Sequence, residues 1–338
     1  MPLPAIGAWL DADAGAMDMR LRARPTRAEA FALALALGAL GLFLWLDHSL
    51  GYIPFDYHVY IKTAHGNMLQ YYYADWILPL FWLLDQFPPL PGFALWSLLN
   101  LVCLFLAARV FGGRAALVLF TFQFFNSLFL GQINGLLAGG LALGWWGMAH
   151  RRWNLAGLGF WLACTKFQIG LPFGLLLWLS APGDWRARLR VLVLPCLLTI
   201  ASFLVYPDWL FHLIERLQAY APYDWGSISL WRFAGPAALV LFLPPLLLPL
   251  ERGQRMLALA AAIPLALPYF QSADLLVLFV LPIGWLPLML GNLGFLFFVY
   301  QFSILRLLWI VPGVLYLSAL LSPLFARLRA RRSKPTGG

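Results

Sequence analysis

The first candidate for chemistry is an acidic residue that follows a long apolar stretch. Asp56 lies in the segment GYIPFDYHVY at residues 51–60, directly after an apolar run at about 28–46. A carboxylate that a rigid element holds near a membrane surface can take a proton from a hydroxyl nucleophile. The alternative interpretation of Asp56 is a helix N-cap or a solvated surface charge.

Two other segments place polar side chains between apolar runs. Lys166 can bind a lipid phosphate as a point charge, or it can simply extend to the interface. Gln132 and Asn134, in the turn GQIN at 131–134, carry amides that donate and accept hydrogen bonds, although Gly and Asn also favour turns. Ionisable groups at membrane depth favour a functional interpretation.

Further polar residues lie in the connections around these segments. The candidates for binding a substrate, besides Gln132 and Asn134, are Tyr57, His58, Tyr60, Gln168 and Gln271. The candidates for binding a donor phosphate, besides Lys166, are Lys62, Arg216, Arg232 and Arg306.

The composition shows which elements must position these residues. Of 338 residues, 62% are hydrophobic and 11% are charged, and the mean hydropathy is +0.79. A soluble domain is about a quarter charged, so lipid must surround most of this chain. We predict an all-α polytopic transmembrane protein with about ten to twelve membrane segments. The approximate spans are 28–46, 76–108 (with a possible break at Pro88 to Pro91), 115–130, 133–149, 154–165, 167–180, 189–206, 232–250, 256–270, 275–290, 292–303 and 305–325. The segments at 154–165 and 292–303 are short for a full span of ~20 residues and are expected to be half-membrane elements.

Lysine and arginine are distributed unevenly along the chain. If both termini are cytoplasmic, 18 of the 23 fall in the N-terminal segment, the inner loops and the tail, as the positive-inside rule requires. The other five map to the outer face with Asp56; they are Lys62, Lys166, Arg216, Arg232 and Arg306. Long outer loops are expected at about 47–75 and 207–231. This clustering is typical of membrane topology and not of a nucleic-acid groove.

The chain divides into three predicted parts. Residues 1–27 form a cytoplasmic segment without an evident cleavage site, 28–325 a transmembrane catalytic domain, and 326–338 a basic cytoplasmic tail. The three cysteines lie in apolar stretches without a CxxC pair, which favours buried hydrophobes. No P-loop, Rossmann fingerprint, HExxH or GxSxG motif is present. We therefore expect no metal or other cofactor, and a monomer in a plasma (inner) membrane.

Several segments, in collinear order, resemble the GT-C type integral membrane glycosyltransferases. The chain is most similar to glycosyltransferase family 87, the polyprenyl-phosphate-mannose-dependent mannosyltransferases of bacteria. FDYHVY at 55–60 looks like that family's D-F-x-V-Y, and the proline-rich end of 71–91 resembles the entry to its second helix. GQIN at 131–134, followed by two leucines, is similar to G-Q-x-N-x-L-L.

A further stretch extends the resemblance, with two departures. Residues 151–166 are similar to R-x-x-x-A-G-x-x-x-G ending in K-P, but Phe167 replaces the proline after the lysine. The family often has W-D-H at a late outer turn, where this chain has YFQS at 269–272.

The resemblance implies a GT-C-like fold whose outer-face loops form the active site. A hexose, mannose in the family, would pass from a polyprenyl-phosphate donor to a lipid or glycan acceptor, with inversion at the sugar carbon. Asp56 would be the general base, and the outer basic residues would bind the phosphate. Two alternatives remain: a lipid-linked sugar translocase or other transporter without transfer chemistry, and an assembly or scaffold protein without a site.

Overall fold

The computed structural model describes residues 14–52, 54–66, 71–181, 184–220, 227–300 and 302–332. Within these ranges the chain is helical, and its β pairing is one isolated bridge between Ser227 and Gln271. The prediction of an all-α polytopic membrane protein is confirmed.

The first half of the chain runs from α1 to α10. The elements are α1 (Ala14–Arg22), α2 (Arg27–Leu50), α3 (Phe55–Ala64), the 3-10 helix η1 (Asp75–Ile77), α4 (Leu78–Leu84), α5 (Pro89–Phe111), α6 (Ala115–Val118), α7 (Phe122–Leu130), α8 (Asn134–Ala149), α9 (Trp153–Ala163) and α10 (Phe167–Ser180).

The second half contains more short and 3-10 elements. They are α11 (Trp185–Val205), α12 (Trp209–Tyr220), α13 (Trp231–Ala234), η3 (Gly235–Phe242), α14 (Leu243–Leu247), α15 (Arg252–Ala266), η4 (Ser272–Leu275), α16 (Leu276–Phe279), α17 (Trp285–Gly291), α18 (Leu293–Tyr300), η5 (Phe302–Trp309) and α19 (Ile310–Arg332).

Four stretches in the described part of the chain are long and apolar enough to cross a membrane. They are Arg27–Leu50, Pro89–Phe111, Trp185–Val205 and Ile304–Pro323, and α7 with α8 is a fifth if this pair, bent by 114°, is one span. The other predicted segments are present as shorter helices. The predicted segment 76–108 is broken, but earlier than expected: α4 ends at Leu84 and α5 begins at Pro89 and continues through Pro91. The two expected half-membrane elements are α9, with 11 residues, and α18, with 8.

The core is built on α8, which packs against α5 on one side and α9 on the other. Small residues make these contacts close. A Cβ at Gly140 would lie 2.7 Å from the carbonyl oxygen of Gly159 on α9, and one at Gly135 would lie 2.3 Å from that of Asn100 on α5. Glycines at such positions let helix backbones approach closely inside a membrane. By contrast, α2 and α11 expose large apolar side chains such as Leu42 and Ile200 to the surroundings.

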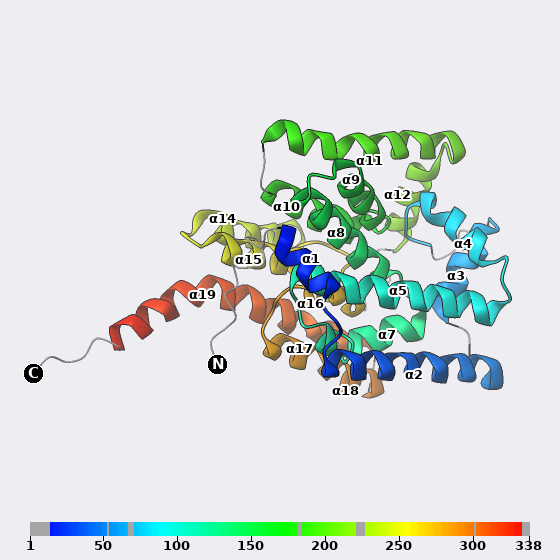
Figure 1. Cartoon of the computed structure of the whole chain (residues 1–338), viewed down its shortest axis with the longest axis horizontal. Helices are drawn as coiled ribbons and strands as arrows, with labels where there is room; N and C mark the ends of the chain where they lie inside the picture. Colours follow the sequence, from blue (N-terminus) through cyan, green and yellow to red (C-terminus); the bar gives the residue numbers. More distant parts are fainter. Residues whose placement is uncertain are drawn as a thin grey trace, which may run out of the picture.

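The two predicted outer loops meet at one end of the molecule. Helices α3, α4 and α12 gather at the right of Figure 1, away from α14 and the far end of α19 at the left. The first loop therefore contains α3, and the second contains α12. Helix α5 runs inward from this end: Pro89 begins it on the side of α3 and α4, and Phe111 ends it beside α1, near the middle of the view.

Candidate active site

Asp56 lies in the first turn of α3, which Pro54 precedes in an extended conformation. The helix dipole favours a negative charge at this position. The Oδ2 of Asp56 accepts a hydrogen bond of 2.6 Å from the Nε2 of Gln132. Part of the Asp56 surface remains exposed. Asp56 as a residue is thus half-buried, and Gln132 holds its carboxylate.

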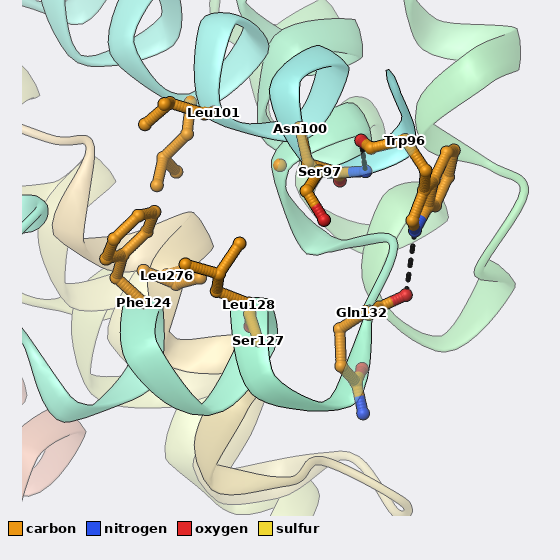
Figure 2. A pocket seen from close by; sticks show the side chains of 12 residues that line it. Trp96, Ser97, Asn100, Leu101, Phe124, Ser127, Leu128, Gln132 and Leu276 are labelled. Carbon is orange, nitrogen blue, oxygen red and sulfur yellow. Dashed lines mark hydrogen bonds between the residues drawn. The ribbon is translucent and has the colours of Figure 1, made fainter. Parts of the chain in front are cut away.

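The turn between α7 and α8 explains why Gln132 reaches Asp56. Gly131 ends α7 with a φ of 73°, and a Cβ there would lie 2.7 Å from the Cβ of Tyr57. Only glycine accommodates both the left-handed backbone and this approach of α3. The Gly131 carbonyl accepts a hydrogen bond of 2.8 Å from the indole Nε1 of Trp96, as Figure 2 shows. Asn134 is fully buried at the start of α8. The motif therefore both forms a turn and supports the carboxylate.

The Asp56 carboxyl has an unusual pKa for an aspartate. Burial raises this pKa to about 7, although the charge of Lys166 and the hydrogen bond from Gln132 act in the opposite direction. The charge of Asp274 adds to the increase. A base with a pKa near neutrality is well matched to proton transfer at physiological pH. Asp56 can therefore accept a proton from a hydroxyl group and release it to water afterwards.

Lys166 immediately precedes α10 and is 4% exposed. Its Nζ donates a hydrogen bond of 2.6 Å to the Oδ1 of Asp274 and lies 5.6 Å from the centre of the Tyr73 ring. A buried charge is stable only with such partners. An ammonium group has three N–H donors, so the pairing with Asp274 leaves donors for a second anion.

The segment before Asp274 has a specific backbone geometry. Tyr269 has a φ of 64°, which is uncommon for a bulky residue, and Gln271 pairs with Ser227 in the isolated bridge. The Oδ2 of Asp274 accepts the backbone N–H of Gln271 at 2.9 Å, in a capping box that starts η4. Both carboxylate oxygens of Asp274 are therefore fixed, one by Lys166 and the other by the main chain.

A second buried ion pair lies in the same region. Arg216 on α12 donates a hydrogen bond of 2.7 Å to the Oδ1 of Asp75, and its guanidinium lies 5.2 Å from the centre of the Tyr71 ring. Tyr71 packs against Tyr73, with ring centres 5.4 Å apart. The hydroxyl of Tyr60 in turn donates to that of Tyr73 at 3.2 Å. These tyrosines connect the two ion pairs, and Arg216 ties α12 to the first predicted outer loop.

The five predicted phosphate-binding cations do not have equivalent positions. Lys166 is the one whose charge acts on the pKa of Asp56. Arg216 is engaged by Asp75. Lys62 and Arg232 are exposed. Arg306 is half-buried on η5, which packs against η4. Of the five predicted phosphate-binding cations, Lys166 is thus the candidate near Asp56. Arg306 lies on η5, next to the element η4 that carries Asp274.

The predicted substrate-binding residues also separate into groups. Tyr57 is buried against Phe93, with ring centres 5.5 Å apart, so it packs α3 on α5. Tyr60 belongs to the buried tyrosine cluster. His58 and Gln168 are half-buried. Gln271 contributes its backbone N–H to the capping of Asp274. His58, Gln168 and Gln271 are therefore the half-buried members of this set, and the others are buried.

Sequence reasoning missed the two aspartates that pair with the buried cations. Neither Asp274 nor Asp75 is among the candidate residues that the sequence indicates. Each lies within an apolar or aromatic stretch, next to Trp76 in one case and Leu275 in the other. An acidic residue in such a context is rare at membrane depth and suggests a buried partner, which is the signal that was available.

A small cavity lies between α5 and α7, behind Gln132. Its volume is about 20 Å³, which is room for about one water molecule. The hydroxyl of Ser97 points from α5 into this space in Figure 2. Neither this hydroxyl nor the Oε1 of Gln132 has a hydrogen-bond partner within the described residues. The cavity is too small for a sugar, so it supports Gln132 and does not bind the substrate.

A much larger apolar cavity lies beside Lys166. Its volume is about 320 Å³, within the range of small-molecule sites. Its walls come from η1, α9, α10 and α11. They include Phe167, the residue after Lys166, and Cys164, two residues before it. The other lining residues are Trp76, Phe160, Trp161, Leu171, Gly174, Leu175, Trp178, Val191, Leu192, Pro195 and Thr199. The space suits an apolar ligand, and it adjoins Lys166 through Phe167, the next residue in the chain.

The described residues contain no group of three or more His, Cys, Asp or Glu side chains that could hold a metal ion. The expectation that the protein uses neither a metal nor another cofactor stays a prediction.

Comparison with known proteins places the chain in a family. The sequence description of glycosyltransferase family 87 matches residues 71–270, which is more than half of the 338 residues. Gln132 and Lys166 fall within the match, whereas Asp56 and Asp274 lie just outside it. Searches of curated proteins and of solved structures give no significant match. The chain belongs to glycosyltransferase family 87.

Proposed function

We propose that the protein transfers a hexose, with mannose as the first candidate, from a polyprenyl-phosphate donor to a lipid or glycan hydroxyl group. Membership in family 87 supports glycosyl transfer over the transporter and scaffold alternatives. The observation that carries the proposal is the half-buried Asp56 carboxylate, which Gln132 holds by a hydrogen bond and whose pKa burial raises while the charge of Lys166 lowers it. Base and phosphate ligand are thus provided within one site.

In the proposed reaction, Asp56 takes the proton of the acceptor hydroxyl as its oxygen attacks the anomeric carbon of the sugar. The bond between that carbon and the phosphate oxygen breaks, and its electron pair leaves with the lipid phosphate. The attack comes from the side opposite the leaving group, so the anomeric configuration inverts. The negative charge of the phosphate rises from one to two, and a fixed cation in a dry site stabilises such a charge effectively.

Lys166 is the proposed ligand of that phosphate. One of its N–H donors is engaged by Asp274, and the others are free to point at a phosphate oxygen. The apolar cavity on its flank, walled by α9, α10 and α11, suits the isoprenoid chain of the donor. Apolar burial of that chain would add affinity in proportion to the area removed from water. A nucleotide sugar is polar throughout and has no apolar chain that could fill this cavity.

We place the site on the outer face of the plasma membrane, with both termini in the cytoplasm. The positive-inside distribution of Lys and Arg supports this orientation. A membrane-impermeant thiol reagent tests it in a chain whose native cysteines are replaced by alanine. Lys62→Cys should react in intact cells, and Arg114→Cys only after permeabilisation; the reverse pattern would place the site in the cytoplasm.

The donor test uses purified protein in proteoliposomes. Polyprenyl-phosphate mannose, polyprenyl-phosphate glucose and GDP-mannose are each offered with a set of lipid and glycan acceptors. We expect a glycosidic product from a lipid-phosphate sugar and none from the nucleotide sugar, with the anomeric configuration inverted by NMR. Transfer from the nucleotide sugar alone, or a retained configuration, would contradict the proposal. Movement of the lipid-linked sugar across the bilayer without a new glycoside would favour the transporter alternative.

A further inference from the structure

The positive charge of the Lys166 ammonium is balanced within the protein by the carboxylate of Asp274. Its Nζ lies 2.6 Å from the Oδ1 of Asp274, and the side chains of the pair are 5% and 0% exposed. A phosphate that binds Lys166 must therefore share it with a fixed anion. Asp274 lies just beyond the segment matched to the family.

Stability alone does not explain this arrangement. A buried ion pair is often no more stable than well-packed apolar residues of the same volume, because both charges lose their hydration. Here the surroundings would favour apolar side chains, since Ala273, Leu275 and Leu276 are all buried. The fold nevertheless aims the Asp274 carboxylate with a left-handed Tyr269 and a capping box at Gln271. Such a fixed, costly charge is better explained by a role at the site.

We propose that Asp274 is a positioning residue that holds the Lys166 ammonium next to Asp56 and competes with phosphate for it. Competition weakens the hold on any anion, and most of all on the doubly charged lipid phosphate that forms when the sugar leaves. Asp274 would thereby disfavour diphosphate-linked donors and speed the release of the product. This inference rests on the proposed function, because it takes a lipid phosphate as the ligand of Lys166.

The charges around Asp56 determine how a change at Asp274 alters the pH profile of kcat/KM. Lys166 and Asp274 act on the Asp56 carboxyl from the α9–α10 connection and from η4, and Gln132 reaches it from the α7–α8 turn. The hydroxyls of Tyr52 and Tyr60 also sense its charge. Asp274 raises the pKa of Asp56, so its neutralisation should move the acid limb of kcat/KM to lower pH. This shift reports only that the charge of Asp274 reaches Asp56, so competition for Lys166 is read from the donor KM and from inhibition by the product.

The test compares Asp274→Asn with a matched control. Asp75→Asn neutralises the other buried aspartate, which pairs with Arg216 and does not contribute to the pKa of Asp56. For Asp274→Asn we expect the KM of the lipid-phosphate donor and the inhibition constant of polyprenyl phosphate to fall by roughly tenfold, as a nearby charge in a partly buried site implies. The kcat should fall because the product leaves slowly. The control should show none of these shifts.

Two further measurements keep the outcome decisive. Asp274→Ser removes the same charge but keeps a hydroxyl that can accept the Gln271 N–H, and it replaces the Asn variant if that one does not fold. Direct binding of a short-chain polyprenyl phosphate needs no turnover. If wild type transfers no sugar, the proposed function fails, while tighter binding by the variant still supports the role of Asp274. Unchanged binding, inhibition and acid limb in the neutral variants would overturn it.

Discussion

The two ends of α5 lie beside buried ion pairs of opposite character. At its far end, Arg109 bonds to Glu29 at 3.0 Å and donates to the backbone oxygens of Arg20 and Ala23. Its guanidinium also lies 4.9 Å from the ring centre of Phe105. The donors of Arg109 are thus consumed by the protein, which ties α1 and α2 to α5.

Near the other end of α5, the Lys166 ammonium has one carboxylate partner and one aromatic ring. It also acts on a second carboxyl, Asp56, whose pKa burial raises to about 7. The difference teaches that burial of an ion pair does not by itself indicate chemistry. A pair that uses all its donors internally stabilises the fold, and a pair that keeps donors beside a half-exposed base can bind and react.

Among changes to the two ion pairs, the largest effect is expected when the pair of Lys166 and Asp274 loses its cation. Lys166→Met should lower kcat by about 10²–10³-fold, because the charge that forms on the leaving phosphate loses its fixed partner. Steady-state transfer by detergent-purified protein, with the folded fraction determined by size-exclusion chromatography, measures this. A Lys166→Met enzyme with wild-type kcat would remove Lys166 from the mechanism.

The corresponding change at the other end should act on stability instead. Arg109→Met leaves the half-buried Glu29 without its partner, which should cost less than the about 3–5 kcal/mol that breaking a fully buried pair typically costs. We expect a lower thermal unfolding midpoint and an unchanged kcat per folded molecule. Selective loss of kcat in a fully stable Arg109→Met protein would show that the two ends are not functionally distinct.

The pH dependence of transfer sharpens the comparison without a mutation. Asp56 must be deprotonated to act as a base, so kcat/KM should rise with pH and level off above about 7. Well below that pH the rate should fall about tenfold per unit. Glu29→Gln, at the other end, should leave the profile in place. A flat profile between pH 5 and 8 would exclude a base with the pKa of Asp56.

The smallest effect is expected from the group that supports Asp56. Gln132→Ala removes a hydrogen bond to the ionised carboxylate, a contact worth about 1.5–3 kcal/mol. Because that bond lowers the pKa of Asp56, its loss should move the acid limb to higher pH and reduce kcat/KM by roughly tenfold at pH 7. Gln123→Ala, in the buried part of α7, is a matched control that should not move the limb.

The sequence predicted the fold class well because lipid exposure leaves a strong compositional signal. It also predicted Asp56 as the base, Lys166 among five phosphate ligands and Gln132 among the substrate-binding residues. These roles stay predictions; the structure shows that Gln132 and the charge of Lys166 both act on Asp56. Their partners were less visible. Asp274 lies 108 residues from Lys166, and such a pairing depends on how α10, η4 and the intervening helices pack. The predicted topology places Arg216 and Lys166 on the same outer side, so the sequence treats them alike. Only the tertiary structure shows that Arg216 forms an ion pair with Asp75.

The central claim is that Asp56 is the base for glycosyl transfer, and a single-turnover experiment tests it most directly. Enzyme loaded with a radiolabelled polyprenyl-phosphate sugar is mixed with acceptor at pH 8, for wild type, Asp56→Asn and Asp85→Asn. Asp85 is a matched carboxylate outside the site that pairs with His65. We expect Asp56→Asn to lower the rate of transfer by about 10²–10⁴-fold, the usual contribution of a general base, and Asp85→Asn to match wild type. Transfer by Asp56→Asn at the wild-type rate would contradict the account.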